Sequence, residues 1–256
     1  MGQMNSRLRL ILRRILAVAS CMVVLHMAAY QPGAREFHAA AAAHPVVSLG
    51  ALEGFVRLAG DLVPHPTYVK NTTDPLVCGQ MQSLEDLIIS AEDRGVKNVI
   101  VALTDVPVSK IPPLTPSRFV LDNRECRFVP HVSVLTVGNL IVATNSDTLL
   151  HTVHFYGALK INIALPKGLT VTKITNEPGM IIVKCDVHGW MQAFIRVDAH
   201  PFHAVTDESG HFHIPNIPAG TYSLEIWHER LGRQKRTIRI KGEHTEVIQV
   251  AYGLDN

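Results

Sequence analysis

Short apolar runs separated by turn residues dominate the chain from about residue 45 onward. The runs are rich in β-branched side chains, and glycine, proline, asparagine and aspartate lie between them. This pattern predicts the strands of sandwiches or barrels rather than helices. We expect strands over residues 46–56, 98–103, 132–137, 140–143, 169–174, 180–183, 194–197, 222–227, 237–240 and 247–250. The chain is therefore predicted to be all-β.

Three segments depart from this strand pattern. Residues 83–93 place Leu84, Leu87 and Ile88 at helical spacing and are ambiguous between helix and strand. The proline-rich stretch 106–116 is typical of a linker or a long crossover, and a second break falls near residue 200. No repeat of fixed period is present.

The N-terminus has the pattern of an export signal. Arginines precede an apolar stretch over residues 15–30, which is short for a membrane-spanning helix, and a short alanine-rich spacer follows. Cleavage would fall at Ala34 or within 39–43, and an uncleaved membrane anchor is the alternative. Arg13 and Arg14 also fit a twin-arginine signal, and Cys21 fits a lipidation site. We expect an exported, periplasmic or extracytoplasmic protein.

Composition excludes two broad classes. The whole chain has 24 Lys and Arg against 22 Asp and Glu, but four of the arginines lie within the first 14 residues. The body without that segment carries 20 against 22, which is too acidic for a nucleic-acid binder. Hydrophobic residues make up 47% of the chain, which argues against disorder.

The sequence CDVHGWM, residues 185–191, carries the strongest chemical signal. One loop leaving a predicted strand presents a thiol at Cys185, an imidazole at His188 and a thioether at Met191. Soft sulfur ligands beside imidazole select copper, and two histidines, one cysteine and a weak axial methionine form an electron-transfer copper site. The segment NSDTLLHTVHF, residues 145–155, supplies His151 and His154 as candidates for the second histidine.

These segments resemble a cupredoxin of the amicyanin and plastocyanin type over about residues 96–198. The resemblance rests on NSDTLLHTVHF, on NEPGMIIVKCDVHGWM (176–191) and on CRFVPHVSVLTVGNLI (126–141). It implies a Greek-key sandwich with one type 1 copper ion held by His151, Cys185, His188 and Met191, and it makes His154 a neighbour. Thr152 replaces the usual asparagine after the first ligand, and Leu150 replaces a proline.

The copper assignment also bears on which cysteines can form a disulfide. With Cys185 committed to the metal and Cys21 in the signal, Cys78 and Cys126 are left as a predicted disulfide, with free thiols as the alternative. Trp190, beside the methionine ligand, is either an exposed docking aromatic or a lid over the site.

The chain ends resemble a second family. AVTDESGHF and IPAGTYSLEIW, within residues 204–227, are similar to a carboxypeptidase-regulatory-like, transthyretin-like (prealbumin-like) sandwich, and residues 50–64 resemble its first strand. We therefore expect a signal and spacer over 1–43, the second sandwich in two parts over 44–95 and 199–256, and the cupredoxin over 96–198. Exported bacterial proteins described as methylamine-utilisation-like combine these two domains.

Other polar groups have a weaker functional interpretation. The remaining histidines could form a second metal site, but ordinary roles on strand faces and in turns are favoured for them. The histidines concerned are His154, His200, His203, His211, His213 and His228. The basic stretch 230–241 is either a docking face for an acidic redox partner or a solvated strand face.

Three functional classes compete. We expect a one-electron carrier between periplasmic or membrane-associated partners, such as c-type cytochromes or an oxidoreductase, with an exposed edge near His188 passing the electron. The alternative is a copper-binding, copper-delivery or surface interaction module. An enzyme is disfavoured because Lys184 and Asp186 flank Cys185, so the His-Cys-His link of multicopper oxidases is missing, as are common hydrolase, nucleotide and haem motifs. No nucleic acid is expected as partner, and the membrane only through an uncleaved N-terminal anchor.

Overall fold

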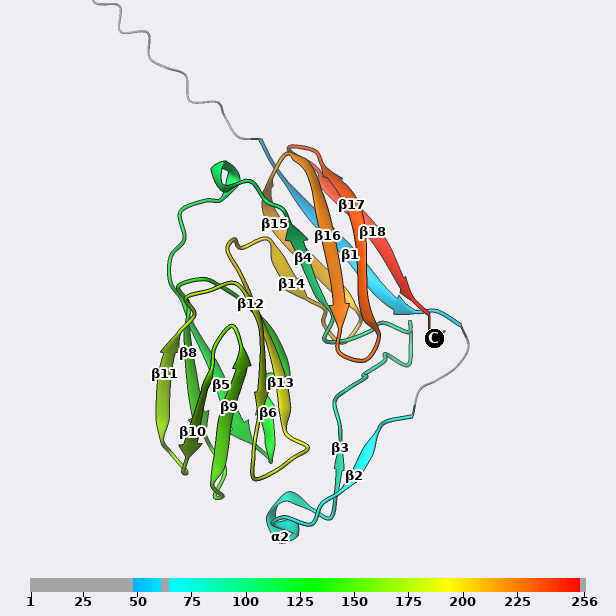
Figure 1. Ribbon diagram of the computed structural model, residues 1–256. Coiled ribbons are helices and arrows are strands. Elements are labelled where there is room, and N and C mark those ends of the chain that lie inside the picture. The colour runs from blue at the N-terminus through cyan, green and yellow to red at the C-terminus, as the bar shows by residue number, and fades with distance from the viewer. Residues whose placement is uncertain (1–47, 61–64, 254–256) are drawn as a thin grey trace, which may run out of the picture. The chain divides into compact units, whose positions relative to one another are not determined.

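The computed structural model describes residues 48–60 and 65–253 (Figure 1). The predicted signal, spacer, lipidation site and anchor of residues 1–43 lie outside the described residues. Within those described ranges, no helix is long and apolar enough to cross a membrane. All described residues belong to one unit that runs from Val46 to Asn256.

Two sheets form the sandwich that carries the candidate site, here called the site sandwich. One sheet has the strand order β10 (Ile161–Leu165), β9 (His151–Gly157), β12 (Gly179–Lys184), β13 (Gln192–Asp198) and β7 (Val132–Thr136). The other has the order β11 (Thr170–Ile174), β8 (Leu140–Asn145), β5 (Arg118–Arg124) and β6 (Arg127–Val129). Buried side chains from both sheets, including Leu121, Phe155 and Ile181, form one apolar core between them.

A second sandwich combines strands from both ends of the described chain. Its first sheet has the order β15 (His211–Pro218), β1 (Leu49–Leu58) and β18 (Thr245–Tyr252). Its second has the order β14 (His203–Val205), β4 (Ile100–Thr104), β16 (Gly220–His228) and β17 (Gly232–Ile240). In β1, buried and more exposed residues alternate, so Leu52, Val56 and Leu58 enter the core, as expected of a strand covered on one face. We call this the chain-end sandwich.

A smaller segment links β1 to β4. It contains the short strands β2 (Tyr68–Lys70) and β3 (Met81–Ser83), which pair with each other, and the single-turn helix α2 (Pro75–Cys78) between them. We call residues 68–83 the arm. A further 3-10 turn, η1 (Val108–Lys110), lies in the proline-rich stretch.

The prediction of an all-β fold with two sandwiches is confirmed, and each of the ten predicted strands corresponds to an observed strand. The ambiguous residues 83–93 hold no helix, because the chain there forms turns and an isolated bridge between Ile89 and Val96. Strand β4, which lies within the predicted cupredoxin range 96–198, pairs with β14 and β16 of the chain-end sandwich.

Candidate metal centre

The ligand loop leaves β12 at Lys184 and returns to the same sheet at β13. Backbone hydrogen bonds close it, because the Cys185 N–H donates to the Met191 carbonyl at 3.3 Å and the Met191 N–H donates to the His188 carbonyl at 2.9 Å. The loop therefore presents Cys185 and His188 from one compact turn. Met191 is 2% exposed and packs in the same core cluster as Cys185.

His151 comes from the other side of the site, at the first position of β9. Asn145, the last residue of β8, stabilises the turn that leads to His151. Its amide donates to the carbonyls of Leu149 and Leu165 at 2.8 and 2.7 Å, and its oxygen accepts the Asp147 N–H. The asparagine that ends this strand thus orders the turn that delivers the histidine.

Three electron-pair donors meet at the centre of the site. The Cys185 Sγ lies 3.9 Å from the His151 Nδ1 and 3.7 Å from the His188 Nδ1, and the two Nδ1 atoms are 3.0 Å apart. Both histidine side chains are 0% exposed. Among the described residues, His151, Cys185 and His188 form one of two groups with metal-binding geometry. The other contains Cys126, whose sulfur is bonded to Cys78 and is not free to ligate.

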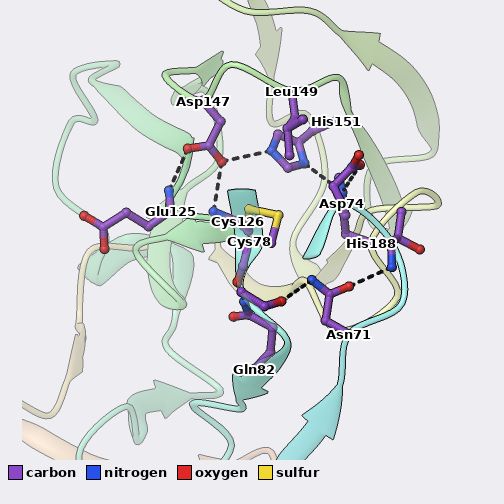
Figure 2. Close-up of a disulfide and its surroundings, with 12 residues drawn as sticks. Asn71, Asp74, Cys78, Gln82, Glu125, Cys126, Asp147, Leu149, His151 and His188 are labelled. Carbon is purple, nitrogen blue, oxygen red and sulfur yellow. Dashed lines mark hydrogen bonds and ion pairs between the residues drawn. A yellow bond between two sulfur atoms is a disulfide. The ribbon is translucent and has the colours of Figure 1, made fainter. Parts of the chain in front are cut away.

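The outer nitrogens fix which ring atom faces the centre. The His151 Nε2–H donates to Asp147 Oδ2 at 2.9 Å, and the His188 Nε2–H donates to Asp74 Oδ2 at 3.1 Å (Figure 2). Because each Nε2 carries its proton toward a carboxylate, each Nδ1 presents a lone pair inward. Two facing lone pairs beside a sulfur repel one another unless a cation lies between them, so the donor set fits a metal ion.

Hydrogen bonds favour the thiolate form of Cys185. Burial raises the pKa of its thiol, but the His151 ring, the Thr152 N–H at 3.4 Å and the His188 contacts outweigh burial and lower the pKa to about 6. Burial alone lowers the pKa of His151, but the contacts to Cys185 and Asp147 outweigh burial, so the pKa of His151 is raised. The sulfur is therefore charged and ready to bind a metal at neutral pH.

Thr152 ties the two ligand loops together. Its hydroxyl accepts the Asp186 N–H at 2.7 Å and lies 3.8 Å from the Cys185 sulfur. The hydroxyl thus makes the link between loops for which the family resemblance expects an asparagine.

A disulfide between Cys78 and Cys126 connects the arm to the site sandwich (Figure 2). Cys78 ends helix α2, which starts one residue after Asp74. On the other side, Asp147 accepts the Cys126 N–H at 2.9 Å as well as the His151 Nε2–H. The outer carboxylates of both histidines are therefore anchored on either side of one disulfide.

The ring of His188 does not itself form an exposed edge, although Asp186, Val187 and Gly189 beside it in the loop are exposed. The arm places Asp74 against the outer nitrogen of this histidine, and the ring has no exposed surface. Trp190 is half-buried: its Nε1–H donates to the Cys126 carbonyl at 3.0 Å and its ring centroid lies 5.1 Å from that of His188. These contacts favour the lid interpretation of Trp190 over an exposed docking aromatic.

His154 and the other histidines lie outside the central group. His154 Nδ1 lies 3.0 Å from the Asp186 carboxylate and 2.8 Å from the Tyr156 hydroxyl. Within the described ranges, neither group with metal-binding geometry includes any of the additional candidates, namely His154, His200, His203, His211, His213 and His228. The structure thus provides other partners for several of them, such as Glu53 for His211 and Asp198 for His203.

Several basic residues of the stretch 230–241 form ion pairs or hydrogen bonds within this chain. Arg230 pairs with Asp86, Arg233 with Glu225 and Lys241 with Glu246, and Arg236 donates to the Gln249 carbonyl. This pattern favours a solvated strand face over a docking face.

Sequence reasoning missed both outer carboxylates. Asp147 had a usable signal, because it lies four residues before His151 in the turn that follows Asn145. Asp74 had none, since 114 residues separate it from His188 and only the fold brings them together.

Comparison with known families and proteins gives partial matches. The family model of polysaccharide lyase family 4, domain II, matches residues 172–247, which run from β11 of the site sandwich into β18 of the chain-end sandwich. It is a different family from the carboxypeptidase-regulatory-like one, whose presence stays a prediction. No curated protein matches the chain.

Solved structures with similarity to this chain include copper proteins. A copper-containing nitrite reductase from Thermus scotoductus SA-01 is 21% identical with a TM-score of 0.30, over 34% of this chain and 23% of that one. A Cu(I) methionine-to-alanine mutant of amicyanin is 18% identical (TM-score 0.28), over 38% and 98%. A purple cupredoxin from Nitrosopumilus maritimus is 19% identical (TM-score 0.28), over 32% and 99%. This chain thus spans less than a quarter of the nitrite reductase.

Proposed function

We propose that this protein binds one copper ion at His151, Cys185, His188 and Met191 and carries single electrons. The observation that carries the proposal is the convergence of two Nδ1 atoms and one thiolate within 3.9 Å in a fully buried site. Two histidines, one cysteine and a weak axial methionine form the ligand set of type 1 copper. Copper supplies the reversible one-electron step, between Cu(II) and Cu(I).

The residues of this chain hold the site rigid and dry. Asp74 and Asp147 orient the two imidazoles, Thr152 orients the sulfur, and Trp190 covers the ligand loop. A site whose ligands move little on a change of metal charge exchanges electrons with little reorganisation. With four protein ligands, no position is left for a substrate on the metal, so we propose a carrier rather than an enzyme.

Burial of the ligands favours a carrier over copper delivery, the alternative function. A delivery protein must hand its ion to an acceptor, which is easiest when a ligand is at the surface. Here both histidines are fully buried, and the carboxylate of the arm blocks the outer side of His188. Slow release of the ion is therefore expected.

The cellular setting belongs to the same proposal. The signal-like N-terminus and the Cys78–Cys126 disulfide suit an exported protein in an oxidising compartment. Its electron acceptor there is a periplasmic or membrane-associated redox protein, such as a c-type cytochrome. In this proposal the chain-end sandwich, with its carboxypeptidase-regulatory-like sequence, is an accessory domain.

Redox cycling tests the carrier against the delivery protein. Copper-loaded protein is cycled between oxidant and reductant in the presence of a Cu(I) chelator, and bound copper is counted after each cycle. A carrier keeps one copper ion per chain and shows the same midpoint potential in both directions. Loss of copper to the chelator on the first reduction would favour delivery.

A further inference from the structure

The ligand loop borders a cavity whose lining includes part of the arm. Gly189, Trp190 and Met191 line this cavity of about 410 Å³. Its other walls come from the arm, from residues 84–86, from β6 and from the turn after β16, where Glu229 lies. The volume is within the range of small-molecule sites, roughly 300–1,000 Å³, and too small for a protein partner.

One part of the cavity is aromatic and apolar. Phe128, Trp190 and Met191 border this part of the cavity, and Trp190, the one of the three that is not almost fully buried, is in ring contact with the ligand His188. A flat ring in this wall packs well against aromatic side chains. A molecule bound there lies against the loop that carries the metal ligands.

The other part of the cavity offers hydrogen-bond acceptors. Glu229 is 10% exposed and accepts hydrogen bonds from His131 and from the Gln192 amide at 3.4 Å. Each carboxylate oxygen accepts about two hydrogen bonds, so Glu229 has capacity for a further donor. Asp86, also in the wall, keeps Oδ1 buried with no hydrogen-bond partner among the described residues.

Charge narrows the class of ligand. Lys70 and Arg127 line the cavity together with Glu85, Asp86 and Glu229, so neither a cation nor an anion is strongly favoured. A neutral molecule with an aromatic ring and hydroxyl donors satisfies both walls.

We propose that this cavity binds a small phenol or benzenediol that donates electrons to the metal centre. The proposal rests on the copper function above and names its electron donor. Oxidation removes one electron and one proton from a phenolic O–H and leaves a neutral phenoxyl radical. The electron reduces Cu(II) to Cu(I), and the proton passes to the Glu229 carboxylate, which accepts the hydrogen bond.

Binding to metal-free protein tests the cavity by itself. Hydroquinone is titrated into the metal-free protein by isothermal calorimetry, with 1,4-dimethoxybenzene as a probe that has the ring but no donor. We expect saturable binding of one hydroquinone per chain and at least tenfold weaker binding of the dimethoxy compound. Equal binding of the two probes, or none, would overturn the proposal.

Two variants locate the binding. Thr72→Phe places a large side chain at an exposed position of the cavity wall, and Glu229→Gln keeps the shape but weakens the acceptor. Each should weaken hydroquinone binding at least tenfold, whereas Glu177→Gln, an exposed acid outside the wall, should not. Unchanged affinity in Thr72→Phe contradicts the assignment even if Glu229→Gln fails to fold.

An experiment on copper-loaded protein tests the electron-donor role separately from the proposed copper site. Bleaching of the thiolate–copper band by hydroquinone should saturate in the native protein and be at least tenfold slower in Thr72→Phe, with the starting spectrum unchanged. Equal bleaching rates would overturn the donor role while leaving the copper site. If no such band forms but hydroquinone binds, the donor role falls together with the proposed function.

Discussion

Thr152 follows the first ligand histidine, where the family resemblance expects asparagine. The chain keeps the link between the two ligand loops by a shorter route, because the threonine hydroxyl accepts the Asp186 N–H and reaches the Cys185 sulfur. Groups that hydrogen-bond to a ligand loop in this way orient the ligands and tune metal affinity.

Thr152→Val should therefore weaken copper binding by roughly tenfold to a hundredfold, because it removes the hydroxyl and keeps the shape. Cu(I) affinity is measured by competition with a chelator. Thr152→Ser, which retains a hydroxyl, should recover most of the affinity, and the exposed Thr170→Val serves as control. Equal affinity in the Val and Ser variants would contradict this role of the hydroxyl.

Asp74 gives the second test at the residue scale. Asp74→Ala removes the acceptor for the His188 Nε2–H and opens the outer side of the ring to water. The rate of copper loss to a chelator should rise about tenfold or more. Asp105→Asn, an exposed substitution outside the site, should leave the rate unchanged. An unchanged rate in Asp74→Ala as well would show that the arm does not close the site.

At the scale of elements, the arm depends on its disulfide. Cys78 and Cys126 are 48 residues apart in sequence, and the chain-entropy model assigns about 4 kcal/mol of stability to closing such a loop. The double variant Cys78→Ser with Cys126→Ser avoids a stray thiol that could exchange with Cys185.

This double variant should lose up to about 4 kcal/mol in free energy of unfolding and release copper faster than the native protein. Denaturant unfolding and chelator competition measure the two effects. If copper release is unchanged although stability falls, the disulfide supports the fold but not the closure of the site.

The turn between β16 and β17 has a built-in pH dependence. His228 is buried, and its Nδ1 accepts the N–H groups of Arg230 and Leu231, which requires the neutral ring. Burial, and then the charges of His131 and Arg230, lower its pKa to about 4. Between pH 6.5 and 4 the unfolded chain binds a proton that the folded chain does not, so stability falls as the pH falls through this window.

His228→Asn should remove this contribution, about 3 kcal/mol across the window, while its side-chain oxygen can still accept an N–H. The difference in unfolding free energy between the native protein and the variant is measured from pH 7 to pH 4. We expect the difference to shrink toward low pH. A difference that is independent of pH would contradict the assignment to His228.

At the scale of the whole molecule, the sequence predicted the strands better than their grouping. Runs such as residues 98–103 read clearly as strands, but nothing in the run itself says that β4 pairs with β14 and β16. Strand β5 (Arg118–Arg124) was missed, because its alternation of exposed and buried positions includes Asp122 and Asn123, which seldom occur in strands.

In the candidate site, too, the local features were predictable from the sequence and the long-range contacts were not. Local spacing was enough to name Cys185, His188 and Met191, since one loop holds all three. The arm was not predictable, because Asp74 contacts His188 only through a long-range arrangement of the chain. The burial of the His188 ring by the arm therefore emerged only from the three-dimensional structure.

The spectrum of copper-loaded protein tests the copper site most directly. Residues 44–256 are produced in an oxidising compartment, one equivalent of Cu(II) is added, and visible and electron paramagnetic resonance spectra are recorded beside those of Cys185→Ser. We expect an intense thiolate-to-copper band with narrow copper hyperfine splitting, which the variant lacks although it remains folded. A colourless native protein, ordinary tetragonal copper, or colour retained in Cys185→Ser would contradict a copper site with Cys185 as ligand.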